Sequence, residues 1–296
     1  MQYGASFSVK YAREMHIDPQ ACLKHALTDL GIKRLRLMSY WDLHESVRGV
    51  YNFAELDWQI TMAEQHNAIV TLSLGLRQPR WPESHWPAWA HDLQPTEWQD
   101  ALCDYIEAVV NRYKDRRCIA SYQLENEAML KTFGKDGDFS RARLKREYRL
   151  VKALDPTRPI IMSTSDSYGI PLLGPRPDMY AFSIYRYFYD RGQYRHSARP
   201  AIFYRIRAAV IRLIKWREVF IHELQAEPWG PTGTIALSPQ EQSKSMDRQR
   251  VQEAVKFATD TKLSPIDIWG LEWWYWLKTA QNRPEIWNDM RQVFSE

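Results

Sequence analysis

The sequence lacks the features that mark a membrane-spanning or metal-binding chain. It has no uninterrupted apolar run long enough to cross a bilayer, and its N-terminus has neither the basic nor the apolar segment of a signal peptide. The three cysteines, Cys22, Cys103 and Cys118, form no Cys-x-x-Cys or Cys/His cluster at metal-ligand spacing. We therefore expect three packed thiols and no metal site. The compartment stays open, because a leader or an anchor absent from this chain would make the protein secreted or surface-anchored.

The chain also has no large excess of positive or of negative residues. The chain has 40 Lys and Arg against 36 Asp and Glu, a net charge of +4, which does not indicate a nucleic-acid partner. The first apolar run is followed by no GxGxxG or GxxxxGKT loop that would hold a nucleotide. We expect no cofactor, no nucleic acid and a monomer.

What the sequence does have is a repeated alternation of short apolar runs with segments of helical periodicity. Between the fifth and sixth runs, Asp166–Asp178 contains several Gly and Pro, so one outer helix is expected to be short or missing there. Eight βα units in 296 residues predict an α/β fold, a closed (β/α)8 TIM barrel forming a single domain over residues 1–296. An open, doubly wound sheet is the alternative, but it would normally carry the missing Gly-rich loop. The predicted strands are Tyr3–Val9, Arg34–Trp41, Ile69–Leu76, Ile119–Glu127, Pro159–Ser165, Met179–Tyr185, Val219–Glu223 and Ile266–Trp274.

Two carboxylates end apolar strands in this assignment. The fourth strand ends in Glu127 and the seventh in Glu223, and the chemistry of such barrels lies at the carboxyl ends of the strands. Strands four and seven lie on opposite sides of an eight-stranded barrel, so the two side chains can face each other across its mouth. Carboxyls about 5 to 5.5 Å apart are the apparatus of a retaining glycosidase. The alternative for either residue is a strand-capping role with surface ion pairs.

The segments around both carboxylates resemble clan A of the glycoside hydrolases, the barrel enzymes whose acid/base Glu follows an Asn on strand four and whose nucleophile Glu ends strand seven. The matching segments are Leu124-Glu-Asn-Glu127 and Phe220-Ile-His-Glu-Leu224. Asp155-Pro-Thr-Arg-Pro159, before strand five, is similar to a connection common in these enzymes. The resemblance implies a metal-independent β-glycosidase, cellulase- or mannanase-like, that acts on a polysaccharide or oligosaccharide; we expect endo action.

Residue by residue, the resemblance implies Glu127 as general acid/base and Glu223 as nucleophile. It further implies Asn126 as donor to the sugar 2-hydroxyl, Arg36 as the cation that holds the nucleophile ionised, and Tyr185 as a hydrogen-bond partner of that nucleophile. Barrel packing is the alternative for Tyr185. Many members of the clan have an aromatic residue and a Pro where this chain has Glu125 and Ala128, so no subfamily is implied. Glu227 competes for the role of nucleophile, but the adjacent Pro and Gly predict a loop, and a nucleophile needs a rigid strand.

Aromatic residues are abundant, with 13 Trp, 16 Tyr and 10 Phe. Alternation along the eighth strand directs Glu272 and Trp274 inward, which makes Trp274 the expected stacking surface for a sugar, with Trp273 as the alternative if a bulge changes the register. Trp81, in the Trp- and Pro-rich loop after the third strand, and Trp41, after the second, are further candidates. Packing of each loop on its own aromatics is the alternative.

The segment Pro200–Trp216 has helical periodicity with one apolar and one basic face. We expect an outer barrel helix that buries its apolar face on the sheet, and contact with a membrane surface is the alternative.

For the whole chain, the alternatives to a glycosidase are a non-catalytic carbohydrate-binding barrel and a metal-dependent barrel enzyme. The latter would need His and Asp at several strand ends, where only His222 is found.

Overall fold

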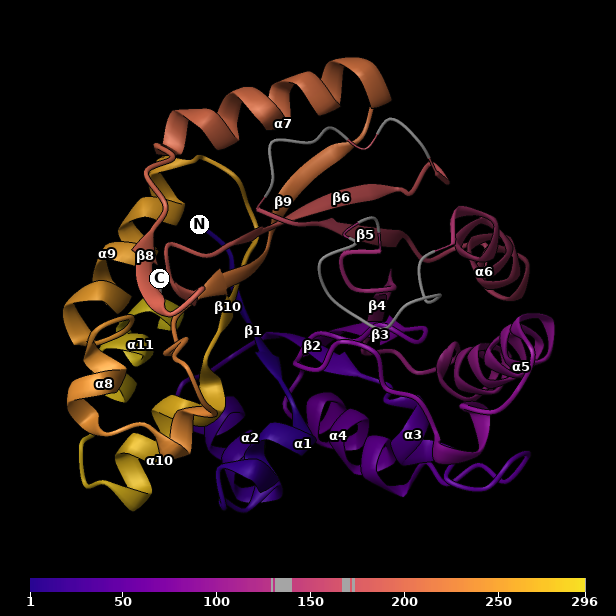
Figure 1. The fold of residues 1–296 in the computed structure, drawn as a ribbon, viewed down its shortest axis with the longest axis horizontal. Coiled ribbons are helices and arrows are strands. Elements are labelled where there is room, and N and C mark those ends of the chain that lie inside the picture. Colours follow the sequence, from indigo (N-terminus) through magenta and orange to yellow (C-terminus); the bar gives the residue numbers. More distant parts are fainter. Residues whose placement is uncertain (129, 131–139, 167–170, 172–173, 296) are drawn as a thin grey trace. The chain divides into compact units, whose positions relative to one another are not determined.

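The computed structural model describes residues 1–128, 130, 140–166, 171 and 174–295. Eight strands form a closed parallel barrel in the order β1-β10-β9-β6-β5-β4-β3-β2, and a separate two-stranded sheet pairs β7 with β8. The prediction of a (β/α)8 TIM barrel is therefore confirmed (Figure 1). The chain divides into two compact units, residues 36–181 and residues 1–35 with 182–296.

The unit of residues 36–181 carries the strands from β2 to β5 and the helices between them. Its strands β3 and β4 pair in parallel, and so do β4 and β5. Helices α5 and α6 lie side by side on its outer surface (Figure 1). The elements are β2 (Arg34–Met38), α3 (Trp41–His44), α4 (Ala54–Gln65), β3 (Ile69–Leu74), η1 (Ala88–Ala90), α5 (Pro95–Tyr113), β4 (Ile119–Leu124), α6 (Arg141–Leu154) and β5 (Ile160–Thr164).

The other unit carries the first strand and the last third of the chain. Helix α7 packs on β9 and α9, and α10 packs on α11 (Figure 1). The elements are β1 (Tyr3–Phe7), α1 (Val9–Glu14), α2 (Pro19–Thr28), β6 (Met179–Ile184), β7 (Tyr187–Asp190), β8 (Gln193–His196), α7 (Ala201–Lys215), β9 (Glu218–Gln225), η2 (Thr234–Ala236), α8 (Pro239–Ser243), α9 (Arg248–Asp260), β10 (Ile266–Trp269), α10 (Leu271–Ala280) and α11 (Glu285–Ser295). Among the described residues, no helix is long and apolar enough to span a bilayer.

All eight predicted barrel strands are present, but the last one was drawn too long. It ends at Trp269, because Gly270 adopts φ 142° and the chain then enters α10. A side chain at Gly270 would bring its Cβ within 2.5 Å of the Ala226 carbonyl oxygen, so both the conformation and the space require glycine. Strand four likewise ends at Leu124, three residues before Glu127. Between β5 and β6 the described residues form no helix, and 167–170 and 172–173 lie outside the described residues.

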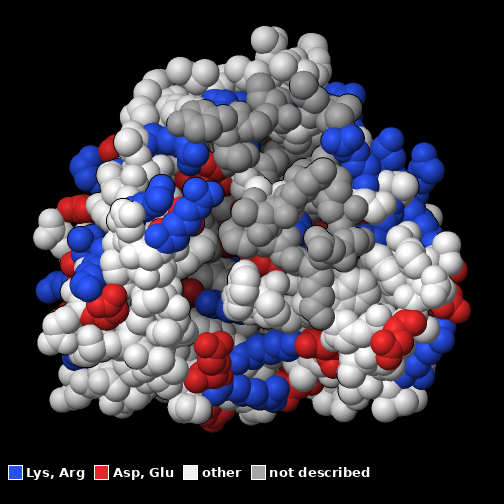
Figure 2. All heavy atoms as spheres, viewed as in Figure 1, with Lys and Arg blue, Asp and Glu red and all other residues white. Residues whose placement is uncertain are grey.

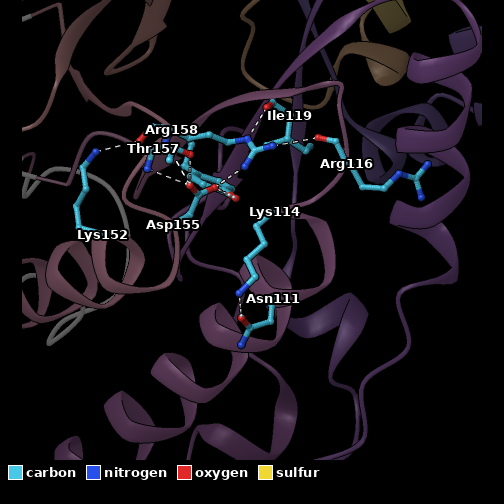
Figure 3. Close-up of polar contacts among 9 residues, drawn as sticks. Asn111, Lys114, Arg116, Ile119, Lys152, Asp155, Thr157 and Arg158 are labelled. Carbon is cyan, nitrogen blue, oxygen red and sulfur yellow. Dashed lines mark hydrogen bonds and ion pairs between the residues drawn. The ribbon is translucent and has the colours of Figure 1, made fainter.

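The connection Asp155–Pro159 ties the start of β4 to the start of β5 (Figure 3). The guanidinium of Arg158 donates to the Asp155 carboxylate at 2.6 Å. The same guanidinium donates to the Ile119 carbonyl oxygen at 2.6 Å and to that of Arg116 at 3.2 Å. These contacts lie at the amino ends of the strands, away from Glu127, so the connection serves the stability of the barrel.

A buried polar cluster joins β9, β10 and the first residue of β2. Asp267 accepts hydrogen bonds from Arg34 at 2.7 and 3.2 Å, and its carboxylate lies 2.5 Å from Nδ1 of His222. Gly4 is required beside this cluster, because a Cβ there would lie 2.3 Å from the Asp267 carboxylate. Burial alone would raise the pKa of Asp267, but the charge of Arg34 and the hydrogen bond with His222 outweigh it and lower the pKa to about 2.

Replacing Asp267 by asparagine should cost about 3 kcal/mol of unfolding free energy at pH 7, because the mostly buried guanidinium of Arg34 then loses its counter-charge. The folded pKa lies below the usual 3.8, so the carboxylate stabilises the fold above about pH 4, and up to about 2 kcal/mol of this is lost as the pH falls toward 2. The deficit of the variant should therefore shrink on acidification. Urea unfolding at pH 7 and pH 3 measures it.

The matched control for this variant is Asp260→Asn, which removes the exposed partner of Lys256 and should leave the urea midpoint nearly unchanged. Equal unfolding midpoints for Asp267→Asn and the wild-type protein at pH 7 would show that the buried cluster contributes no net stability.

Candidate active site

The segment after β4 holds Glu127 by its backbone. Glu125 and Glu127 have φ of 51° and 44°, so the chain makes a tight left-handed turn where β4 ends. The Glu127 amide donates to the hydroxyl of Ser163 on β5 at 2.8 Å, and its carbonyl accepts from Arg77 at 3.0 Å. The Glu127 side chain is half-buried. Its main chain is therefore fixed to the neighbouring strand and to the loop after β3.

Both the nitrogen and the oxygen of the Asn126 side-chain amide are held by hydrogen bonds. Its Nδ2 donates to the Glu83 carboxylate at 2.8 Å, and its Oδ1 accepts from Gln123 at 2.9 Å and from Ser163 at 3.2 Å. The hydroxyl of Ser163 thus forms hydrogen bonds with both Asn126 and Glu127, and the three residues belong to one polar cluster. Glu83 and Ser163 were missed from the sequence. The available signal was the polar Ser163 at the end of an otherwise apolar strand.

Glu125 has a structural role beneath this turn. Its carboxylate accepts the backbone amides of Leu76 and Arg77 at 2.7 and 2.9 Å and forms a buried ion pair with Arg143 at 2.6 Å. Gly75 is necessary there, because a Cβ would lie 2.3 Å from the Glu125 carboxylate. The residue that departs from the commonest clan pattern is therefore the one that joins the ends of β3 and β4.

Arg143 bridges Glu125 to a second buried carboxylate, Glu147, at 2.5 Å. Burial raises the pKa of Glu147 above its usual value; the charge of Arg143 opposes this increase and the nearby Glu125 adds to it. One guanidinium thus faces two carboxyls in the interior. The cluster anchors α6 to the turn that carries Glu127.

Glu223 lies within β9 and is 6% exposed. Its carboxylate accepts a hydrogen bond from the hydroxyl of Tyr185, which follows β6 directly. The Tyr185 ring packs edge-on against Trp229, with ring centroids 5.2 Å apart. The structure thus brings Tyr185 and Glu223 together, as the resemblance implied. β9 continues for two residues past Glu223, so the predicted strand end was placed too early.

Glu227, the competing nucleophile, lies two residues beyond β9 and is 5% exposed. Its carboxylate accepts a hydrogen bond from the indole N–H of Trp269 at 2.8 Å. Both carboxylates are therefore buried and hydrogen-bonded. The two residues differ in the backbone that carries them, because Glu223 belongs to a strand that pairs with β10 and Glu227 belongs to the loop that follows this strand.

Arg36 lies in the middle of β2, not near its end, and its side chain is fully buried. One of its terminal nitrogens donates to the side-chain oxygen of Gln123 on β4 at 3.3 Å. Gln123 also donates to Asn126, so Arg36 is connected through one amide to the cluster around Glu127. Its predicted role beside the nucleophile stays a prediction.

Two of the predicted stacking residues are core residues. Trp41 is fully buried, donates to Glu45 at 2.6 Å and packs edge-on against Trp89. Trp274 lies in α10 and not in a strand, is fully buried, and donates to the Ala226 carbonyl at 2.8 Å. A ring with no exposed surface offers no face to a sugar, so the expectation that these two line a cleft is wrong. The alternation argument failed for Trp274 because a helix begins at Leu271.

Trp273, the alternative to Trp274, is also buried and donates to Gln242 at 3.0 Å. Trp81 differs from all of these, because 73% of its surface is exposed in the loop after β3. Glu83, in the same loop, is the residue that holds Asn126. The described part of the chain contains no group of three or more His, Cys, Asp or Glu side chains arranged to hold a metal ion.

The fold is similar to those of solved glycosidases. A GH5_18 protein of Bifidobacterium longum in complex with Manb1-4GlcNAc superimposes with a TM-score of 0.64 at 12% identity, over 91% of this chain and 68% of that chain. For xylanase 10B of Thermotoga maritima the TM-score is 0.60 at 15% identity, over 90% and 82%. For an exo-β-1,4-mannosidase of Opitutaceae bacterium strain TAV5 it is 0.59 at 14% identity, over 91% and 51%.

The chain spans about half or less of the length of other solved structures that it matches, 52% of one and 40% of another. No protein-family model matches the sequence, and no curated protein is significantly similar to it. At these identities the likeness is one of fold. The chain has a (β/α)8 barrel fold, which it shares with these solved glycosidases.

Proposed function

We propose that this chain is a retaining β-glycoside hydrolase that cleaves a polysaccharide or an oligosaccharide by double displacement. Glu127 is the general acid/base and Glu223 the nucleophile. The observation that carries the proposal is the hydrogen bond from the Tyr185 hydroxyl to Glu223, because it fixes the position of a carboxylate on a paired strand, as a nucleophile requires. The names of the solved structures with this fold, a xylanase and a mannosidase among them, support the same class of reaction.

The reaction has two steps with balanced proton transfers. Protonated Glu127 gives its proton to the glycosidic oxygen while the Glu223 carboxylate attacks the anomeric carbon, which breaks the glycosidic bond and forms a glycosyl ester. The Glu127 carboxylate then removes a proton from water, the water oxygen attacks the anomeric carbon, and Glu223 leaves as a carboxylate. The fixed main chain of Glu127 supports this double role, since the same carboxyl must meet first the leaving group and then the water.

Asn126 and Trp81 are the proposed substrate contacts. An amide has two N–H bonds, and Glu83 orients the Asn126 amide by accepting from it, which supports Asn126 as donor to a sugar hydroxyl. The exposed ring of Trp81 supports stacking on a sugar, whose axial C–H bonds form an apolar face.

Replacing Trp81 by alanine should raise KM for a polymeric substrate about tenfold and leave kcat nearly unchanged, because stacking is worth about 1.4 kcal/mol in both the ground and the transition state. Steady-state kinetics measure this split. The matched control is Trp216→Ala, since Trp216 is 77% exposed and follows α7. An unchanged KM for the Trp81 variant would show that the Trp81 ring does not bind substrate and only packs within its own loop.

The proposed function is tested with a panel of β-linked plant, fungal and bacterial polysaccharides, with product sizing and proton NMR of the first-formed anomer. We expect internal cleavage, with products of several sizes, and initial release of the β-anomer. Initial release of the α-anomer would contradict retention, and release of single terminal sugars would contradict endo action. Binding without cleavage across the panel would contradict the enzyme and favour a carbohydrate-binding barrel.

A further inference from the structure

Helix α7 exposes several of its apolar residues. Ile202, Ile206 and Leu213 are 49%, 58% and 75% exposed, and Trp216, the residue that ends the helix, is 77% exposed. The expected outer helix is present and buries one face, but it also has a second, apolar face that is exposed. In the space-filling view the upper rim, which α7 occupies in Figure 1, consists mostly of uncharged residues, with basic side chains beside it (Figure 2).

A different face of α7 fastens it to the barrel. That face consists of Tyr204, Arg207, Ala208 and Ile211, all of which are buried. The Arg207 guanidinium lies over the ring of Phe182, 4.3 Å from its centroid, and α7 packs on β9 and α9. The helix is thus anchored without its outward apolar residues, which remain available to a partner.

The outward residues form one continuous stripe. Ile202, Ile206, Ala209, Leu213 and Trp216 are all exposed and follow each other at intervals of four and three residues, the spacing of a single helix face. At about 1.5 Å per residue the stripe is about 20 Å long. An apolar stripe of this length on a surface marks a site of interaction.

The charge around the stripe identifies the partner. From Arg191 to Arg217 the sequence contains Arg and Lys but no Asp or Glu, although the whole chain is nearly balanced. Arg205 and Arg212 lie along one side of the stripe, two helical turns apart, and the first acidic residue after the helix, Glu218, pairs with Arg212 at 2.9 Å. A second copy of the same surface would bring like charges together. The partner must be apolar at its centre and anionic at its edge.

We propose that α7 docks on a lipid bilayer that contains anionic headgroups. The apolar stripe enters the boundary between headgroups and acyl chains, Arg205 and the basic residues at the helix ends contact phosphate groups, and Trp216 lies at the interface. Each basic residue near an anionic surface strengthens the binding. The proposal rests on α7 alone and does not depend on the proposed glycosidase function.

Co-sedimentation of the full chain with vesicles tests this docking. We expect binding to vesicles of phosphatidylglycerol and phosphatidylcholine in equal parts, at least tenfold weaker binding to phosphatidylcholine alone, and weaker binding in high salt. Ile206→Ser with Leu213→Ser should weaken binding at least tenfold. The matched control, Val47→Ser with Val50→Ser, changes two side chains that are each 60% exposed elsewhere and should bind as the wild-type protein does.

All substituted residues are exposed, so circular dichroism should show the wild-type fold for both double variants. Failure of the wild-type protein to sediment with the anionic vesicles would overturn the proposal. Equal binding by the α7 variant would overturn it as well. Light scattering without vesicles gives a third outcome, because a dimer that Ile206→Ser with Leu213→Ser dissociates would identify a second copy of the chain as the partner instead.

Discussion

The Glu223→Ala variant should have no measurable activity on any β-glycoside that the wild-type protein cleaves, a loss beyond the about 10⁴-fold that a general acid or base supplies. The first chemical step needs a nucleophile at the anomeric carbon, and the variant has none. On an aryl β-glycoside with a good leaving group, added azide can fill the space left by the carboxylate and attack the anomeric carbon from the α face. The β-glycoside should then give the α-glycosyl azide, the inverted product.

The control for Glu223→Ala is Glu227→Ala, which removes the other buried carboxylate of the same segment. Because Glu227 accepts a hydrogen bond from Trp269, the isosteric Glu227→Gln is included to keep that contact. Both Glu227 variants should retain hydrolysis and give no inverted azide. Inverted azide from Glu227→Ala together with activity of Glu223→Ala would show that the nucleophile lies on the loop after β9.

The Glu127→Ala variant should lose about 10²- to 10⁴-fold of kcat on a natural polysaccharide, whose leaving group needs a proton. On a 2,4-dinitrophenyl β-glycoside the first step needs no proton, so the glycosyl enzyme should form rapidly and hydrolyse slowly, with a burst of dinitrophenol. Azide should accelerate turnover and give the β-glycosyl azide, with retained configuration. The alkaline limb of the bell-shaped pH profile should disappear with the acid.

Glu83→Gln is the control for Glu127→Ala, because it changes a neighbouring carboxylate that holds Asn126 while keeping an oxygen acceptor. Its activity should decrease by a similar factor on good and poor leaving groups. If Glu127→Ala shows no dependence on the leaving group, Glu127 does not protonate the glycosidic oxygen.

The barrel itself was predictable because its signal is local. Alternating strand and helix patterns recur through the chain, and every predicted strand overlaps an observed one. The strand ends were less predictable, because the pattern of hydrophobic residues does not show where the backbone conformation changes. Gly270, with φ 142°, ends β10 inside an aromatic run whose alternation indicated a longer strand. The assignment of Trp274 to a sugar-binding face failed for this reason.

The polar clusters could not be read from the sequence, since their members lie far apart along the chain. Glu83, Asn126 and Ser163 come from three different segments, and their hydrogen bonds depend on the pairing of β4 with β5. The pairing of Tyr185 with Glu223 was proposed only through the resemblance to a family. The exposed apolar face of α7 was not predicted, because its sequence has apolar residues on two faces and only the packing on β9 and α9 decides which face is buried.

Mass spectrometry of a trapped glycosyl enzyme tests the central claim most directly. The reagent is a 2-deoxy-2-fluoro-β-glycosyl fluoride of the sugar that the polysaccharide panel identifies, because the 2-fluorine slows release of the intermediate more than its formation. After digestion, we expect one labelled peptide with the sugar on Glu223. A label on Glu227 or on any other residue, or an active enzyme that takes up no label, would contradict double displacement through Glu223.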